Sequence, residues 1–168
     1  VDQNGNGHLS TVIQTGNLNN SNVDQDVADN TSNVVQLGDN NHSAVFQRNG
    51  IGNDANIDQI GVYNSSHSYQ FGSDNKSTID QNGSANRALS QTWGDYNETF
   101  TYQDGTDNFS DIEQGTDPQP TADYNWAYVN QAGDFNQSSV KQLGDWNTSN
   151  VTQDGDRNNS DVDQDGGH

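Results

Sequence analysis

The chain has 168 residues, of which only 27% are hydrophobic, and its formal net charge is −19. Nucleic acid is a disfavoured partner, because phosphate binding needs cationic side chains and the chain has only 5 Lys and Arg. The absence of Cys excludes a disulfide framework and a thiolate metal site, and no apolar run approaches the roughly 18 residues needed for insertion into a membrane.

A polar composition of this kind is ordinarily typical of disorder, but this sequence repeats with a period of eleven residues. The unit is clearest at 147–157, NTSNVTQDGDR, where Asn147, Ser149, Val151, Gln153 and Gly155 stand two residues apart. A spacing of two is the spacing of side chains on one face of a β-strand. Each unit therefore predicts a strand with Asn, a small residue, an aliphatic residue and Gln on one face, followed by a turn at Gly.

From the N-terminus onward, two amide series mark successive units, and Gln3 opens the first of them. The glutamine series continues with Gln14, Gln25, Gln36, Gln47, Gln59, Gln70, Gln81, Gln103, Gln114, Gln131, Gln142, Gln153 and Gln164. The asparagine series comprises Asn19, Asn30, Asn41, Asn53, Asn64, Asn75, Asn86, Asn97, Asn108, Asn125, Asn136, Asn147 and Asn158. We predict that these residues form a structural ladder.

Three departures from the period are informative. Between Gln81 and Gln103 we place Thr92, not Gln91, in the glutamine position, because a slip by one residue would turn every side chain of the strand to the wrong face. In the same region Ser68, Ser90 and Thr101 replace the aliphatic residue, which predicts the weakest apolar core in the middle of the chain.

The third departure is an insertion at 115–123, which contains Pro118 and Pro120. Proline cannot donate to a β-ladder, so the insertion is predicted to bulge from a turn. The chain is otherwise interpreted as one repeat domain, 1–168. One further extra residue falls in the turn between Gln47 and Asn53.

The period predicts an all-β fold. Two units of 11 make one turn of 22 residues, so the simplest architecture is a β-solenoid in which two parallel sheets face each other. Buried amides normally cost several kcal/mol each without partners. In register, however, each amide can donate to the identical amide one layer away, as in the Asn and Gln ladders of cross-β structures. Neither end of the array carries a recognisable cap, and uncapped solenoids polymerise.

The sequence resembles the curlin family, the subunits of bacterial curli. That family repeats Ser, Gln, Gly, Asn, Ala and Gln at alternating positions over about 22 residues, and the match here is carried by Ser21, Gln25, Asn30, Ser32, Gln36, Gly38, Asn41 and Ser43. The resemblance implies a secreted subunit of an extracellular, cell-surface amyloid fibre in biofilm matrix. It also implies a homopolymer, a nucleator subunit and an outer-membrane secretion machinery as partners.

Other chemistry is disfavoured by the residues present. No nucleophile is paired with a base, so no catalytic residue and no cofactor is predicted. The start of a calcium-binding loop is resembled by Asp161, Asp163 and Asp165. These residues fall on the outward-facing positions of the last predicted strand, so no metal site is predicted. Asp58 and Asp80 are predicted to be neighbours on one sheet, where like charges repel and added divalent cations would relieve the repulsion.

Aromatic and apolar residues are concentrated on the outer faces in the middle of the chain. They are Phe46, Tyr69 and Leu89 on one sheet, and Phe100, Tyr102 and Tyr128 on the other. One interpretation is stacking that stiffens the middle of the rod; the other is a lateral contact between fibres or with a surface.

A structural fibre subunit that assembles end to end by templated strand stacking is the preferred function. The alternative is a monomeric β-solenoid that binds ice or carbohydrate. Such a module would need a flat, regular outward array of one residue type, such as Thr, whereas the outward residues here are heterogeneous.

Overall fold

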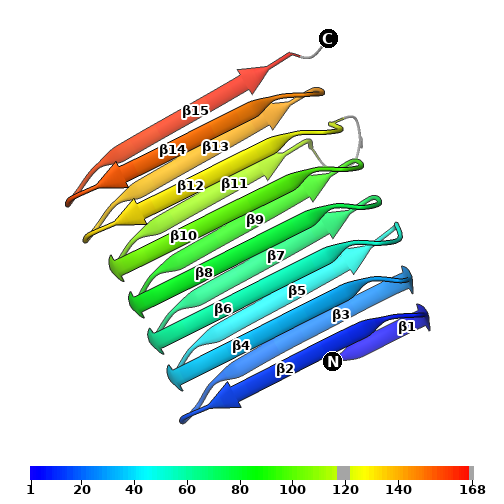
Figure 1. The fold of residues 1–168 in the computed structure, drawn as a ribbon, viewed down its shortest axis with the longest axis horizontal. Helices are drawn as coiled ribbons and strands as arrows, with labels where there is room; N and C mark the ends of the chain where they lie inside the picture. The colour runs from blue at the N-terminus through cyan, green and yellow to red at the C-terminus, as the bar shows by residue number, and fades with distance from the viewer. Residues whose placement is uncertain (117–121, 167–168) are drawn as a thin grey trace.

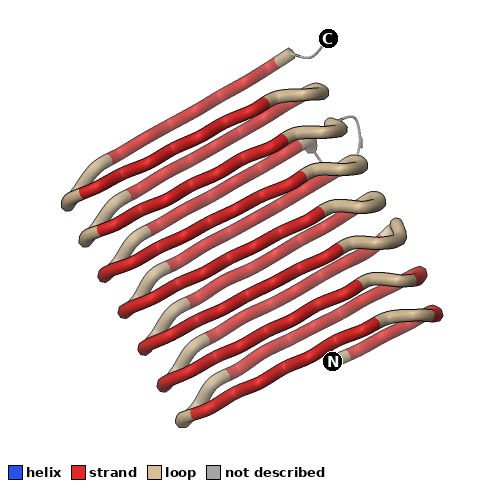
Figure 2. Tube along the Cα trace, in the orientation of Figure 1, coloured by secondary structure: helices blue, strands red, loops and turns tan. Residues whose placement is uncertain are grey.

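The computed structural model describes residues 1–116 and 122–166, which form a stack of β-strands wound into a flattened rod (Figures 1 and 2). The chain runs back and forth between two sheets, and its ends lie at opposite ends of the stack. These residues include no helix that is long and apolar enough to cross a membrane.

The strands alternate between the two sheets along the chain. The 8-stranded sheet contains β1 (Asp2–Asn6), β3 (Asn20–Ala28), β5 (His42–Arg48), β7 (Ser65–Phe71), β9 (Arg87–Trp93), β11 (Phe109–Gln114), β13 (Gln137–Leu143) and β15 (Asn159–Asp165). The 7-stranded sheet contains β2 (Leu9–Thr15), β4 (Thr31–Asp39), β6 (Asp54–Val62), β8 (Lys76–Ser84), β10 (Glu98–Thr106), β12 (Trp126–Ala132) and β14 (Thr148–Asp154). The predicted β-solenoid with two facing parallel sheets is confirmed.

Every strand pairs in parallel with the strand two positions away in sequence, and the repeat sets the register. Gln25 lies beside Gln47, 22 residues later. The step is 23 residues from Gln36 to Gln59 and 28 residues from Gln103 to Gln131. Pro118 and Pro120 lie outside the described residues, but strands on both sides of the insertion stay in register. Ala122 is buried, and its carbonyl accepts a hydrogen bond from Asn97 Nδ2 at 2.6 Å.

The prediction that Thr92, and not Gln91, occupies the glutamine position of its strand is confirmed. Thr92 lies beside Gln70, and Gln91 lies beside Tyr69 on the outer face. Thr92 is fully buried, whereas Gln91 is partly exposed. The strand therefore keeps its inner face and loses one glutamine from the ladder, because the alternative register would have buried the outward side chains.

The apolar core is divided in the middle, as the serine and threonine substitutions predict. One buried cluster extends from Val23 to Ala88 in sequence and a second from Ile112 to Val151. Between them the aliphatic positions are occupied by the buried side chains of Ser90 and Thr101, while buried Ser68 replaces an aliphatic residue within the range of the first cluster. Hydroxyl contacts replace apolar ones there: Ser90 Oγ lies 2.6 Å from Thr99 Oγ1.

Tight turns connect the layers, and their backbone conformation is demanding. Near the C-terminal end of β6, Gly61 has φ +118°, and a Cβ built on it would lie 1.9 Å from the carbonyl oxygen of Gly83. Only glycine allows this approach between layers. Two residues later Tyr63 has φ 59°, in the left-handed region, and its N–H donates to the carbonyl of Asp39 at 3.1 Å. The turns are thus bonded layer to layer like the strands.

Candidate functional site: the amide ladders and the open ends

The glutamines of the 7-stranded sheet form one unbroken ladder in the interior. Each Nε2 donates to the Oε1 of the glutamine one layer closer to the C-terminus, at 2.6–2.9 Å. The ladder runs through Gln14, Gln36, Gln59, Gln81, Gln103, Gln131 and Gln153. Its interior members are buried, so these amides meet their hydrogen-bonding needs within the protein rather than from water.

From Gln25 onward, the second amide hydrogen of the ladder glutamines joins the two sheets. Gln59 Nε2 donates to the carbonyl of His42 at 3.0 Å, and Gln103 Nε2 donates to the carbonyl of Arg87 at 3.0 Å. In both cases the acceptor is the first residue of the preceding strand, in the opposite sheet. One side chain therefore sets both the spacing between layers and the alignment of the two sheets.

The glutamine ladder of the 8-stranded sheet has one break, at Thr92. It runs from Gln3 through Gln25 and Gln47 to Gln70, and resumes from Gln114 through Gln142 to Gln164. At the break, Gln70 Nε2 donates instead to the carbonyl of Asn75 at 2.9 Å. Gln114 Oε1 is buried without a hydrogen-bond partner. The short threonine side chain does not span the distance to either amide.

The asparagines form two further ladders along the turns. The backbone N–H of each asparagine donates to the Oδ1 of the asparagine one layer closer to the N-terminus, for example from Asn86 to Asn64 at 3.1 Å. The Asn86 Nδ2 donates in the other direction, to the carbonyl of Gly105 at 3.0 Å. His8 occupies the asparagine position of its unit, and its Nδ1 accepts from the N–H of Asn30 at 3.4 Å.

The candidate lateral residues lie on the outer faces, but not all in single columns. Phe46 and Tyr69 are stacked, with ring centroids 5.0 Å apart. Leu89 lies in the adjacent column, beside His67, because it occupies the third position of its strand and Tyr69 the fifth. On the other sheet Phe100 lies beside Tyr128.

Tyr102 completes that second group from the same strand as Phe100. Its ring centroid is 5.6 Å from that of Tyr128, with the planes tilted by 40°. Trp126 extends the group, with its ring centroid 5.9 Å from that of Tyr128. The sequence reasoning did not include Trp126.

A third aromatic column, at the turns, was also missed. Tyr96, Tyr124 and Trp146 are stacked, with ring centroids 4.9 and 4.4 Å apart. All three are exposed and precede an asparagine of the ladder directly. Counting the residue before each asparagine as part of the repeat would have placed them in one column.

The carboxylates of Asp58 and Asp80 are neighbours on the outer face of the 7-stranded sheet, as predicted. Burial raises the pKa of the Asp58 carboxyl, and its Oδ1 has no hydrogen-bond partner. Burial also raises the pKa of Asp80, with further contributions from the charges of Asp58 and Asp104. Among the described residues, no group of three or more His, Asp or Glu side chains is placed to hold a metal ion.

We expect Asp80→Asn to stabilise the folded chain at neutral pH by up to about 1 kcal/mol, since it removes one of two like charges on adjacent strands. Because the folded pKa of Asp80 is raised, the folded state binds more protons than the unfolded state between the ordinary aspartate pKa, about 3.9, and the raised value. Stability therefore falls as pH rises through that window. Urea unfolding at a series of pH values should show that the free energy of unfolding falls less steeply with rising pH in the variant than in the unmodified chain. Asp161→Asn, on an exposed position, is the control, and an equal effect from it would contradict the prediction.

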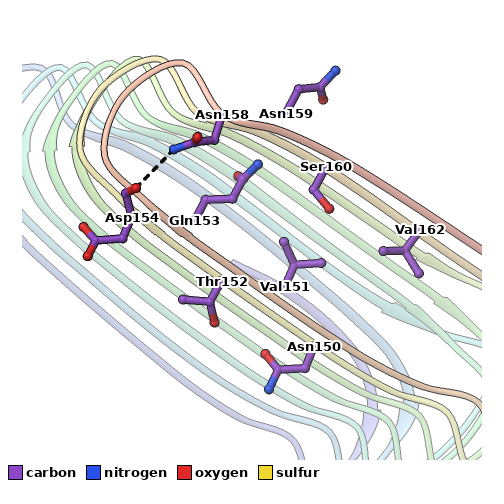
Figure 3. Close-up of a pocket in the computed structure, with 9 residues that line it drawn as sticks. All are labelled: Asn150, Val151, Thr152, Gln153, Asp154, Asn158, Asn159, Ser160 and Val162. Carbon is purple, nitrogen blue, oxygen red and sulfur yellow. Dashed lines mark hydrogen bonds between the residues drawn. The ribbon is translucent and has the colours of Figure 1, made fainter.

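Both ends of the stack leave ladder groups without partners. In the described chain, Oε1 of Gln3 and of Gln14 accepts no hydrogen bond, and Nε2 of Gln164 donates only to the backbone, at the carbonyl of Thr148. Val1 is 70% exposed although the equivalent interior valines are buried. Figure 3 shows the C-terminal end, where Val151 and Gln153 line a hollow together with Ser160 and Val162.

A comparison with protein families matches residues 28–61 and 52–83 to the curlin-associated repeat. The matched residues, 28–83, make up 56 of the 168 residues and are similar to the curlin-associated repeat. A comparison with curated proteins found no match. The matched segments include the amide positions from Asn30 to Gln81, whose hydrogen bonds form part of the ladders.

The curlin-repeat family is a family of structural fibre proteins. The β-solenoid and its repeats fit a curli-type structural subunit. The solenoid extends the same pattern of layers well beyond the matched residues, through β14 and β15.

Proposed function

We propose that this protein is the subunit of an extracellular, curli-like amyloid fibre that assembles end to end. The observation that carries the proposal is the open state of both ends: among the described residues, the end strand of each sheet has an unpaired backbone edge, and the glutamine beside it lacks a ladder partner on its outer side. An uncapped parallel edge is a template for the next strand. A further copy supplies the same layer of strand, glutamine and asparagine that each interior layer receives from its neighbour.

The proposed biological setting is the biofilm matrix, with the fibre secreted, attached to the cell surface and taking part in adhesion. The proposed partners are further copies of the same chain, together with a nucleator subunit and an outer-membrane secretion machinery. This setting is supported by the curlin repeats, whose family consists of secreted fibre components.

Seeded assembly tests the proposal. Freshly desalted chain is followed with an amyloid-binding dye, with and without a few per cent of preformed, sonicated fibres. The expected result is a lag phase that the seeds remove, and fibres that diffract with a cross-β spacing of about 4.8 Å. A chain that stays monomeric and soluble at high concentration, with or without seeds, would contradict fibre formation and favour a monomeric binding module.

We further propose that the outer aromatic residues make lateral contacts between fibres. Replacing Phe46 and Tyr69 with Ser removes a stacked pair from the face of the 8-stranded sheet without touching the ladders. Single fibres should form at an unchanged rate, whereas bundles seen by electron microscopy should disappear. The matched control is the replacement of Tyr96 and Tyr124, a stacked pair at the turns, which should leave bundling intact. Bundles that persist in the first variant would refute the contact.

A further inference from the structure

The two ends of the rod are stepped. The sheets contain 8 and 7 strands, and β1 and β15 both belong to the larger one. At each end, therefore, the 8-stranded sheet extends one strand beyond the other sheet, as Figure 1 shows for β15 over β14 and for β1 below β2. Each end consists of one protruding strand and one vacant strand position opposite it.

The vacant position at the C-terminal end is a hollow of about 430 Å³ above β14. Its floor includes Val151 and Gln153, and its far side includes Ser160 and Val162 of β15 (Figure 3). These residues occupy the repeat positions that are covered by the next layer everywhere in the interior. The hollow thus lies at the position that the next strand of the 7-stranded sheet would occupy.

We propose that the next subunit in the fibre is rotated by a half-turn about the fibre axis. This inference rests on the proposed function and specifies how two successive subunits of the fibre meet, a contact that we call the joint. The rotation places the protruding β1 of the second copy in the hollow above β14, and its β2 on β15. Strand direction is preserved, because the two sheets run oppositely and the rotation exchanges them. The fibre then continues the solenoid without interruption, each sheet alternating 8 and 7 strands.

The hydrogen-bonding groups at this joint are complementary. With Gln153 beside Gln3 of the second copy, and Gln164 beside Gln14, each free amide hydrogen meets a free Oε1, as in the interior ladders. Asn158 Oδ1 meets the backbone N–H of His8 of the second copy, by the same pattern that joins successive asparagines.

A second copy stacked without rotation fits poorly. Its β1 would lie on β15, and the 7-stranded sheet would keep one empty strand position at every joint, with no strand paired to the outer edge of β14. It would also place Asp2 of the second copy beside Asp163, and like charges at directly adjacent positions are unfavourable. With the half-turn, Asp2 lies beside Thr152 and Asp163 lies beside Ile13, so neither pair is repulsive.

Paired cysteines distinguish the two joints, because the chain has no Cys of its own. The variants are Asp2→Cys with Thr152→Cys, and Asp2→Cys with Asp163→Cys. All three positions are exposed and point away from the ladders, so both variants should fold and form fibres. Adjacent positions on neighbouring strands are about 4.8 Å apart, within the Cα separation that a disulfide spans. Fibres are oxidised with diamide, dissolved in denaturant and examined on a non-reducing gel.

The half-turn predicts a ladder of cross-linked multimers from the variant with Cys at positions 2 and 152, and mainly monomer from the variant with Cys at positions 2 and 163. The single variants, each with one of these cysteines, control for random cross-linking. The reverse result would overturn the half-turn while leaving end-to-end assembly standing. Fibres in which neither pair cross-links would also overturn it. If the unmodified chain forms no fibres, the proposed function fails instead.

Discussion

Gly61→Ala is expected to destabilise the folded chain by roughly 2–6 kcal/mol. Overpacking costs about 1–3 kcal/mol, and a side chain in a sparsely populated backbone region about 1–3 kcal/mol. Both apply, since Gly61 has φ +118° and the new methyl group would lie 1.9 Å from the carbonyl oxygen of Gly83. Urea unfolding followed by circular dichroism, at concentrations too low for assembly, measures the loss.

Gly155→Ala is the matched control. Gly155 also has positive φ, +100°, but the nearest atom to a methyl group added there is Asn158 Nδ2, at 3.9 Å. In a single chain this substitution should therefore cost only the strain of placing a residue with a side chain in a sparsely populated backbone conformation, about 1–3 kcal/mol. In a fibre with the half-turn joint, Gly5 of the next copy covers the position, and elongation should slow sharply. Equal losses of stability in the two variants would contradict the close-approach explanation.

Thr92→Gln is expected to stabilise the chain by about 1–3 kcal/mol, the penalty of a buried acceptor left without a hydrogen bond. A glutamine at this position can accept from Gln70 and donate to Gln114, whose Oε1 is buried without a partner. The ladder of the 8-stranded sheet would then be continuous. The midpoint of urea unfolding should rise while the slope stays constant.

The reverse substitution in the intact ladder supplies the control. Gln59→Thr leaves the Gln36 amide and Gln81 Oε1 without their ladder partners and should cost about 2–4 kcal/mol. If Thr92→Gln is neutral or destabilising while Gln59→Thr behaves as expected, the side chain at position 92 does not fit the ladder.

The sequence predicts the fold closely, because one short pattern determines strand length, face and register together. The position of Thr92 illustrates this: the inner face decides the register even where the glutamine is lost. Ser68, Ser90 and Thr101 likewise locate the polar gap in the core. Both inferences depend only on which residues alternate, and alternation is visible in the sequence.

The outer faces and turns are less predictable, because the repeat does not constrain them. Leu89 lies on the strand next to that of Tyr69, which suggests that it belongs with Phe46 and Tyr69. Its position along the strand, however, places it beside His67 and therefore in a different column. Tyr63 occupies the left-handed region, which bulky residues rarely adopt, because the bonded stack of turns imposes that conformation. The step at each end likewise depends on counting the short strand β1, whose first residues could be assigned to a strand or to a free terminus.

The direction of the amide bonds has a consequence for growth. In the intact ladders each glutamine donates toward the C-terminal end, while each asparagine N–H donates toward the N-terminal end. One tip of the proposed fibre would therefore present glutamine amide hydrogens and asparagine oxygens, and the other would present glutamine oxygens. We expect two tips with different chemistry to capture incoming chains at different speeds, so that the proposed fibre has a fast end and a slow end, and chains that bind one tip need not block the other.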